Sequence, residues 1–185
     1  AAALLGSANL WGLLADDPAI GRTAQALGAD VCFFLYGGCV LLEGRGEEFV
    51  HALAPRTDSI VLIRPDEGVS TAKAYAMFDE DPVYPAADAL ADLAARNNAA
   101  DIPLWNNLEA PAQKILPELA EIHAMASDFE GVSSVLMCGS GSVTLAVCED
   151  LRAAQALSAA AQLHGWWART TSFANIRAAI LPERK

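Results

Sequence analysis

Basic residues are scarce in this sequence, which has 12 Lys and Arg against 23 Asp and Glu in 185 residues and a formal net charge of -11. Binding to nucleic-acid phosphates or to an anionic membrane surface depends on clustered Lys and Arg side chains. The charge balance therefore predicts a protein that binds neither nucleic acid nor membranes.

Long apolar runs, export signals and metal-type cysteine spacings are missing as well. No apolar run reaches the roughly 18 residues that would cross a bilayer, and residues 1–14 show neither a basic leader nor a small-residue cleavage site. The cysteines form no CxxC pair and lie in apolar segments, at Cys32, Cys39, Cys138 and Cys148. We expect them to be reduced and buried, without a bound metal, in a cytoplasmic protein.

Apolar residues are plentiful, at 54% of the chain, so a folded core is expected. Up to residue 53, hydrophobic patterning and turn residues predict helices over 1–14 and 18–27, a hairpin of strands 31–35 and 39–42, and a strand over 47–53. Pro, Arg, Thr and Asp then cluster at residues 54–58, which indicates a domain seam.

The chain beyond this seam alternates strands with helices. We expect strands over 59–63, 133–137, 143–148 and 166–171, and helices over 72–78, 86–95, 111–125 and 151–163. The first of these strands is apolar at successive positions, which is typical of a strand buried on both faces. The predicted fold class is α+β, with helices packed on one face of a mainly antiparallel sheet.

Two polar segments near predicted elements could carry chemistry. Asp30 precedes an apolar run and could accept a proton from a hydroxyl, although an isolated Asp more often serves a turn. Thr71 and Tyr75 follow Gly68 at the start of a helix. Ser70 and Thr71 supply capping hydroxyls there, and an aromatic residue at this spacing belongs to a core more often than to a ligand site.

Two further segments resemble turns. Gly139-Ser140-Gly141 separates two apolar strands, and successive N–H groups in such a turn can bind an anion, although the same pattern also forms ordinary hairpins. Residues 106–109, Asn-Asn-Leu-Glu, are expected to cap the helix that begins near Pro111. Taken singly, none of these segments decides a function.

Their order and spacing are more specific. The sequence has ADVxFFLxGGxxLxEGxGE from residue 29, VST at 69–71 with an aromatic residue one turn later, NNLE at 106–109 and MxGSGS at 137–142. This combination resembles the diphosphocytidyl-methylerythritol kinases of the GHMP small-molecule kinase superfamily, over nearly the whole chain.

The resemblance implies a fold and a reaction. The fold is a remnant of the GHMP kinase amino-terminal domain over residues 1–56, with helices and a hairpin, followed by a ferredoxin-like carboxy-terminal domain over 57–185. The reaction transfers the γ-phosphate of ATP, with Mg²⁺ on the nucleotide, to the 2-hydroxyl of 4-diphosphocytidyl-2-C-methylerythritol in non-mevalonate isoprenoid biosynthesis. The alternatives are another GHMP kinase, of the homoserine or mevalonate type, and a non-catalytic binding module.

The resemblance also implies residue roles. Asp30 is the catalytic base, Tyr75 stacks on cytosine, and Thr71 lines the same pocket. Gly139, Ser140 and Gly141 form the family's third motif, a glycine turn beside the phosphate and substrate sites. No protein ligand for a metal follows from it.

The sequence departs from the family at three positions and lacks three segments. Cys32 replaces Pro, Asn107 replaces Asp, and Cys138 replaces Ser, so we expect Asn107 to keep hydrogen bonds but no charge. The family's strand with its catalytic Lys, its DGYH segment and its GGGSSDAA phosphate loop do not occur. Because the phosphate loop and the Lys stabilise the transferred phosphate, we expect a carboxy-terminal portion of an enzyme that is inactive alone.

Overall fold

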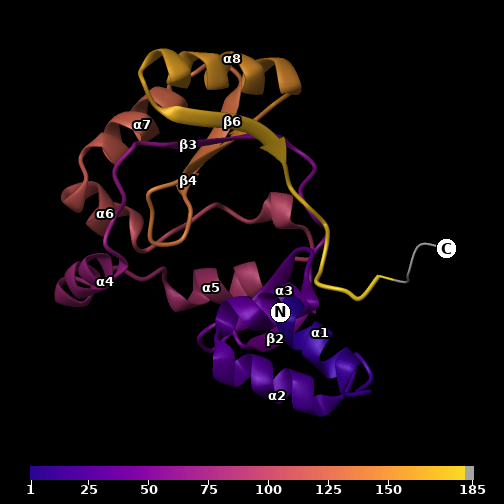
Figure 1. Ribbon diagram of the computed structural model, residues 1–185. Helices are drawn as coiled ribbons and strands as arrows, with labels where there is room; N and C mark the ends of the chain where they lie inside the picture. The colour runs from indigo at the N-terminus through magenta and orange to yellow at the C-terminus, as the bar shows by residue number, and fades with distance from the viewer. Residues whose placement is uncertain (182–185) are drawn as a thin grey trace. The chain divides into compact units, whose positions relative to one another are not determined.

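The computed structural model describes residues 1–181, without the side chains of 87–90 (Figure 1). The chain forms two compact units, which are described separately. The smaller contains Ala1–Pro55, Ala94–Asp101 and the described residues from Ala174 onward, and the larger contains Arg56–Leu93 and Ile102–Phe173. Each unit contains more than one segment of the chain, whereas the sequence predicted two continuous domains with one boundary after residue 56. The assignment of residues 1–56 and 57–185 to two kinase domains stays a prediction.

The larger unit is built on a four-stranded antiparallel sheet. Its strand order is β4-β5-β3-β6, formed by Val132–Met137, Thr144–Cys148, Ser59–Arg64 and Trp167–Ser172. Helices connect β3 to β4 and β5 to β6, and a short turn connects β4 to β5. This βαββαβ connectivity is that of a ferredoxin-like fold. The expected α+β fold class is therefore confirmed.

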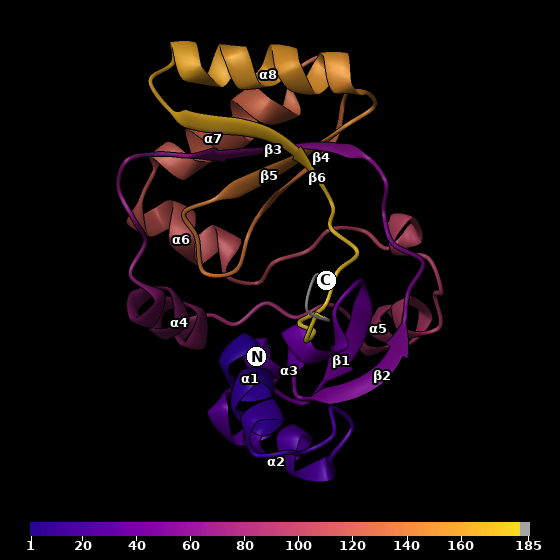
Figure 2. The ribbon, with the colours of Figure 1, turned by 45° about the vertical axis from the view of Figure 1, so that its right-hand side comes forward.

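Two helices, α7 (Glu118–Ser127) and α8 (Leu151–Leu163), cover one face of this sheet, as Figure 2 shows. Their buried side chains form one hydrophobic cluster with residues of β3, β5 and β6, including Val61, Ile63, Ile122 and Leu157. Burial of this apolar surface stabilises the packing of helices on sheet. Ile60 is also buried, next to Val61, so β3 is enclosed on both faces as expected.

The helix expected over residues 111–125 is wrong in its extent, because the segment forms two helices. These are α6 (Glu109–Ile115) and α7, and the chain bends between them at Leu116. Pro117 lacks an N–H and its ring would clash with the preceding helical turn, so it starts α7 and cannot continue α6. The helices α4 (Thr71–Glu80), α5 (Ala87–Ala94) and α8 lie within two residues of their expected bounds.

The smaller unit packs α1 (Ala2–Leu10), α2 (Pro18–Leu27) and α3 (Ala29–Tyr36) with a hairpin of β1 (Val40–Glu43) and β2 (Glu48–Ala52), and includes the 3₁₀ helix η1 (Ala99–Asp101). The second helix begins as expected. The Asp17 carboxylate accepts a hydrogen bond of 2.8 Å from the N–H of Ala19, and Pro18 occupies the first turn.

The expected strand over residues 31–35 is wrong, because these residues belong to α3. The hairpin is instead formed by the two strands that follow. Val31, Phe33 and Phe34 favour a strand by local propensity, but only a helix buries Cys32 and lets Leu35, three residues later, pack against the core cluster of this unit. Tertiary packing here outweighs local strand propensity.

No helix in the described part of the chain is long and apolar enough to span a membrane. All four cysteines are free, but only Cys32 and Cys148 are buried, whereas Cys39 and Cys138 are partly exposed. Burial raises the pKa of each thiol above its ordinary value, so the cysteines are protonated at neutral pH. The expectation of fully buried cysteines therefore holds for two of them.

We predict that Leu157→Ala lowers the free energy of unfolding of the larger unit by about 2–5 kcal/mol, because it leaves a cavity where a fully buried side chain packs between α8 and the sheet. The measurement is urea denaturation followed by circular dichroism. Leu163→Ala is the matched control on the same helix, since Leu163 is 89% exposed. Equal stabilities of the two variants would contradict the described packing of α8.

Candidate functional site

One groove of the larger unit collects most of the residues singled out in the sequence. Its volume is about 480 Å³, and it is lined by α4, by the segment before α6 and by the turn between β4 and β5. Thr71, Tyr75, Gly139 and Ser140 all line it. The other lining residues are Phe78, Trp105, Asn106, Asn107 and Leu108. The groove therefore unites the two positions expected to bind substrate with two of the three third-motif residues.

Helix α4 contributes Thr71, Tyr75 and Phe78 to the groove from one side of the helix. Ala74 is fully buried, and Phe78 packs in a cluster with Leu108, Ala112, Leu119 and Met137. Thr71 and Tyr75 are four residues apart and so lie on the same side of the helix. Tyr75 is 53% exposed, which excludes the core role that its helical spacing favoured.

A hydroxyl pair connects α4 to the glycine turn. The Oγ1 atom of Thr71 and the Oγ atom of Ser140 lie 2.7 Å apart and share a hydrogen bond. Ser70, the residue before α4, forms no side-chain capping bond. The expectation that hydroxyls would cap this helix is therefore wrong, because the Thr71 hydroxyl makes a tertiary contact instead.

Asn106 holds the same turn from the other side. Its Nδ2 donates hydrogen bonds of 2.7 Å to the carbonyl oxygens of Met137 and Gly139, and its Oδ1 accepts one of 2.9 Å from the N–H of Leu108. The expected capping of a helix at Pro111 is wrong, since α6 begins at Glu109 without a side-chain cap. Sequence reasoning missed this role because the carbonyl partners are 31 and 33 residues away.

The glycine turn itself leaves main-chain donors available. Gly139 and Gly141 have φ angles of 56° and 92°, a region that glycine adopts without steric cost. The turn is closed by a hydrogen bond of 3.0 Å from the N–H of Gly141 to the carbonyl of Cys138. Within residues 1–181 no hydrogen bond occupies the N–H of Gly139 or Ser140, so both can donate to an anionic ligand.

Trp105, which sequence reasoning did not single out, lines the same groove. Its Nε1 donates a hydrogen bond to the Oδ1 of Asn107, and its side chain is 57% exposed. Asn107, which replaces an Asp of the resembled family, thus keeps an acceptor role without a charge. The signal available in the sequence was an aromatic residue directly before the Asn-Asn-Leu-Glu segment.

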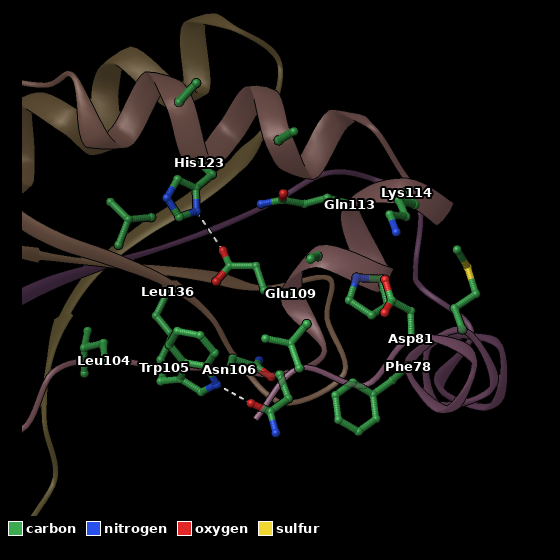
Figure 3. A pocket seen from close by; sticks show the side chains of 18 residues that line it. Phe78, Asp81, Leu104, Trp105, Asn106, Glu109, Gln113, Lys114, His123 and Leu136 are labelled. Atoms are coloured by element: carbon green, nitrogen blue, oxygen red, sulfur yellow. Dashed lines mark hydrogen bonds and ion pairs between the residues drawn. The ribbon is translucent and has the colours of Figure 1, made fainter. Parts of the chain in front are cut away.

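A second groove of about 540 Å³ adjoins the first and shares Trp105, Phe78 and both asparagines with it (Figure 3). The Glu109 carboxylate accepts a hydrogen bond of 2.7 Å from the Nδ1 of His123, which joins α6 to α7. Both side chains are partly buried, at 16% and 35% exposure. Both side chains of this pair also line the second groove.

Asp30, the expected catalytic base, lies in the smaller unit and does not line the groove. It is exposed in the first turn of α3, where the positive end of the helix dipole stabilises a carboxylate. Its predicted place at the edge of a strand is wrong, because the strand is a helix. Gly141 is the third-motif residue that does not line the groove.

Comparison with known proteins places these residues in a family. Residues 75–165 match the model of the GHMP kinases C terminal, a range that includes Tyr75, both asparagines and the glycine turn. The 4-diphosphocytidyl-2-C-methyl-D-erythritol kinase of Pelotomaculum thermopropionicum is 34% identical over 86% of this chain and 56% of its own length. The kinase of the same name from Moorella thermoacetica is 36% identical, over 88% and 59%. The chain thus spans little more than half the length of these relatives.

Solved structures show the same likeness. The crystal structure of a 4-(cytidine 5'-diphospho)-2C-methyl-D-erythritol kinase has a TM-score of 0.66 and 31% identity, over 92% of this chain and 62% of that one. A homoserine kinase from Cytophaga hutchinsonii, at 22% identity and a TM-score of 0.58, shares the fold over 80% of this chain and 52% of its own. The predicted GHMP kinase-like fold and the resemblance to the diphosphocytidyl-methylerythritol kinases are therefore confirmed, and residues 75–165 form the GHMP kinase carboxy-terminal region of this chain.

Proposed function

We propose that the whole protein, rather than the 185-residue chain alone, transfers the γ-phosphate of ATP to the 2-hydroxyl of 4-diphosphocytidyl-2-C-methyl-D-erythritol, in isoprenoid biosynthesis. The observation that carries the proposal is the groove that unites Tyr75 and Thr71 with the glycine turn. A cytidyl diphosphate has a flat base and an anionic chain. An exposed aromatic ring can stack on the flat base, and main-chain N–H groups can donate hydrogen bonds to the anionic diphosphate.

In this proposal the cytosine ring stacks on Tyr75, and the Thr71 hydroxyl lines the base pocket beside it. The available N–H groups of Gly139 and Ser140 donate to phosphate oxygens of the substrate. Asn106 keeps these two donors in place through its bonds to the carbonyls of Met137 and Gly139. The names of the curated relatives support the same substrate.

Asp30 is proposed to orient the 2-hydroxyl and to accept its proton. The hydroxyl oxygen then forms a bond to the γ-phosphorus, the bond from that phosphorus to the leaving ADP oxygen breaks, and the proton moves to the Asp30 carboxylate. Asp30 is exposed in the first turn of α3, so its carboxylate is open to a substrate, as this role requires.

ATP supplies the phosphoryl group, and Mg²⁺ accompanies the nucleotide and offsets its charge. The described residues include no group of three or more His, Cys, Asp or Glu side chains that could hold a metal ion, so no residue of this chain is assigned as its ligand. No GGGSSDAA loop occurs in the sequence, so no residue is assigned to the triphosphate either. Free thiols suit a reducing compartment, and we propose a cytoplasmic location.

We predict that Tyr75→Ala weakens binding of cytidine 5'-diphosphate to the chain by about 1–3 kcal/mol, the scale of stacking between a base and an aromatic ring. Isothermal titration calorimetry measures the affinity. The melting temperature should stay unchanged, because the side chain is 53% exposed.

Tyr84→Ala is the matched control, since Tyr84 is an exposed tyrosine of the same unit that does not line the groove. It should bind cytidine 5'-diphosphate like the unchanged chain. Adenosine 5'-diphosphate should bind the groove more weakly than the cytidine nucleotide. A chain that binds no cytidine 5'-diphosphate, or a Tyr75→Ala variant with unaltered affinity, would contradict the proposed base pocket.

In the whole protein, we predict that Asp30→Asn lowers turnover by roughly 100-fold or more without unfolding, because the amide has a similar volume but cannot accept the proton. The natural gene with this change should fail to support growth of a bacterium depleted of its own diphosphocytidyl-methylerythritol kinase. Asp16→Asn changes another exposed carboxylate of the same unit and should support growth. Growth with Asp30→Asn at equal protein abundance would remove Asp30 from the mechanism.

A further inference from the structure

Trp105 forms a hydrogen bond through its indole N–H although more than half of its side chain is exposed. Its indole N–H donates to Asn107, and the adjacent Asn106 is bonded to both Met137 and Gly139. The indole is therefore bonded to Asn107, and the next residue in the chain, Asn106, is bonded to the glycine turn. A ring that is ordered before binding loses less conformational entropy when a ligand packs on it.

The Trp105 ring lines the same groove as Tyr75. Both side chains line the groove of about 480 Å³, Tyr75 from α4 and Trp105 from the segment before α6. Trp105 also lines the adjoining groove of about 540 Å³ (Figure 3). A flat ligand that lies on Tyr75 thus has a second aromatic surface within the same cavity.

We propose that Trp105 is a second binding residue for the nucleobase, and that its indole packs against the pyrimidine that stacks on Tyr75. This inference rests on the proposed function. Each aromatic side chain that stacks on the base adds to the affinity for the nucleotide, and the tryptophan ring offers the largest aromatic surface. Asn107 is then a positioning residue, because its Oδ1 fixes the indole without lying against the base.

The test compares binding of cytidine 5'-diphosphate to the 185-residue chain and to its Trp105→Phe and Trp105→Ala variants. Trp105→Ala should weaken binding roughly 10-fold or more, whereas Trp105→Phe, which keeps an aromatic face, should retain most of the affinity. The nucleotide should also quench the indole fluorescence of the unchanged chain. Trp105→Phe should lose this quenching, and Trp167→Phe, which alters a partly exposed tryptophan outside the groove, should keep it.

The outcomes separate this inference from the proposed function. If Tyr75→Ala weakens binding but Trp105→Ala does not, and the quenching survives in Trp105→Phe, the role of Trp105 is overturned while the proposed base pocket stands. If the unchanged chain binds no cytidine 5'-diphosphate, both are overturned. If Trp105→Ala weakens binding only together with a lowered melting temperature, and Trp105→Phe weakens it equally, the indole acts through folding and the proposal is again overturned.

Discussion

The hydrogen bonds of one amide side chain fix the geometry of the candidate site. Asn106 donates to the carbonyls on either side of Cys138 and accepts from Leu108, so the end of β4 and the approach to α6 are joined through it. Loss of the bond to Met137 would leave a partly buried carbonyl unpaired, at a cost of about 1–3 kcal/mol, whereas the Gly139 carbonyl is exposed. Asn106 therefore joins the glycine turn, which contains Ser140, to the segment before α6, which contains Trp105, and both residues line the groove.

Hydrophobic packing beneath the groove determines which side chains remain available to a ligand. The cluster that contains Phe78, Leu108, Ala112, Leu119 and Met137 draws α4 and α6 onto the end of β4. Packing of this kind is non-directional, so it sets how closely the elements approach and not where their polar atoms point. The bonds of Asn106 and the hydroxyl pair supply that direction. Ala74 and Phe78 make the buried contacts of α4, and Tyr75 stays 53% exposed.

The strands β3 and β5 of the larger unit were predictable because their residues are mostly apolar and β-branched, and α8 was predictable because it is rich in Ala and Leu. The helix at residues 29–36 was not, since its β-branched and aromatic residues favour a strand locally and only contacts with distant residues decide for a helix. The break between α6 and α7 could be predicted from Pro117, which cannot continue a helix. Asp30, Thr71, Tyr75 and the glycine turn were assigned through resemblance, whereas the contacts of Asn106 and the exposure of Trp105 required coordinates, because sequence distance hides them.

The hydroxyl pair between α4 and the glycine turn has a further consequence for how the groove meets a ligand. Thr71 and Ser140 are each able to donate or to accept, and either can be the donor in their shared bond. Rotation of two hydroxyl hydrogens therefore reverses the polarity of the pair without moving a heavy atom. With the same backbone arrangement, the pair can therefore offer a hydrogen-bond donor to a phosphate oxygen or an acceptor to an amino group.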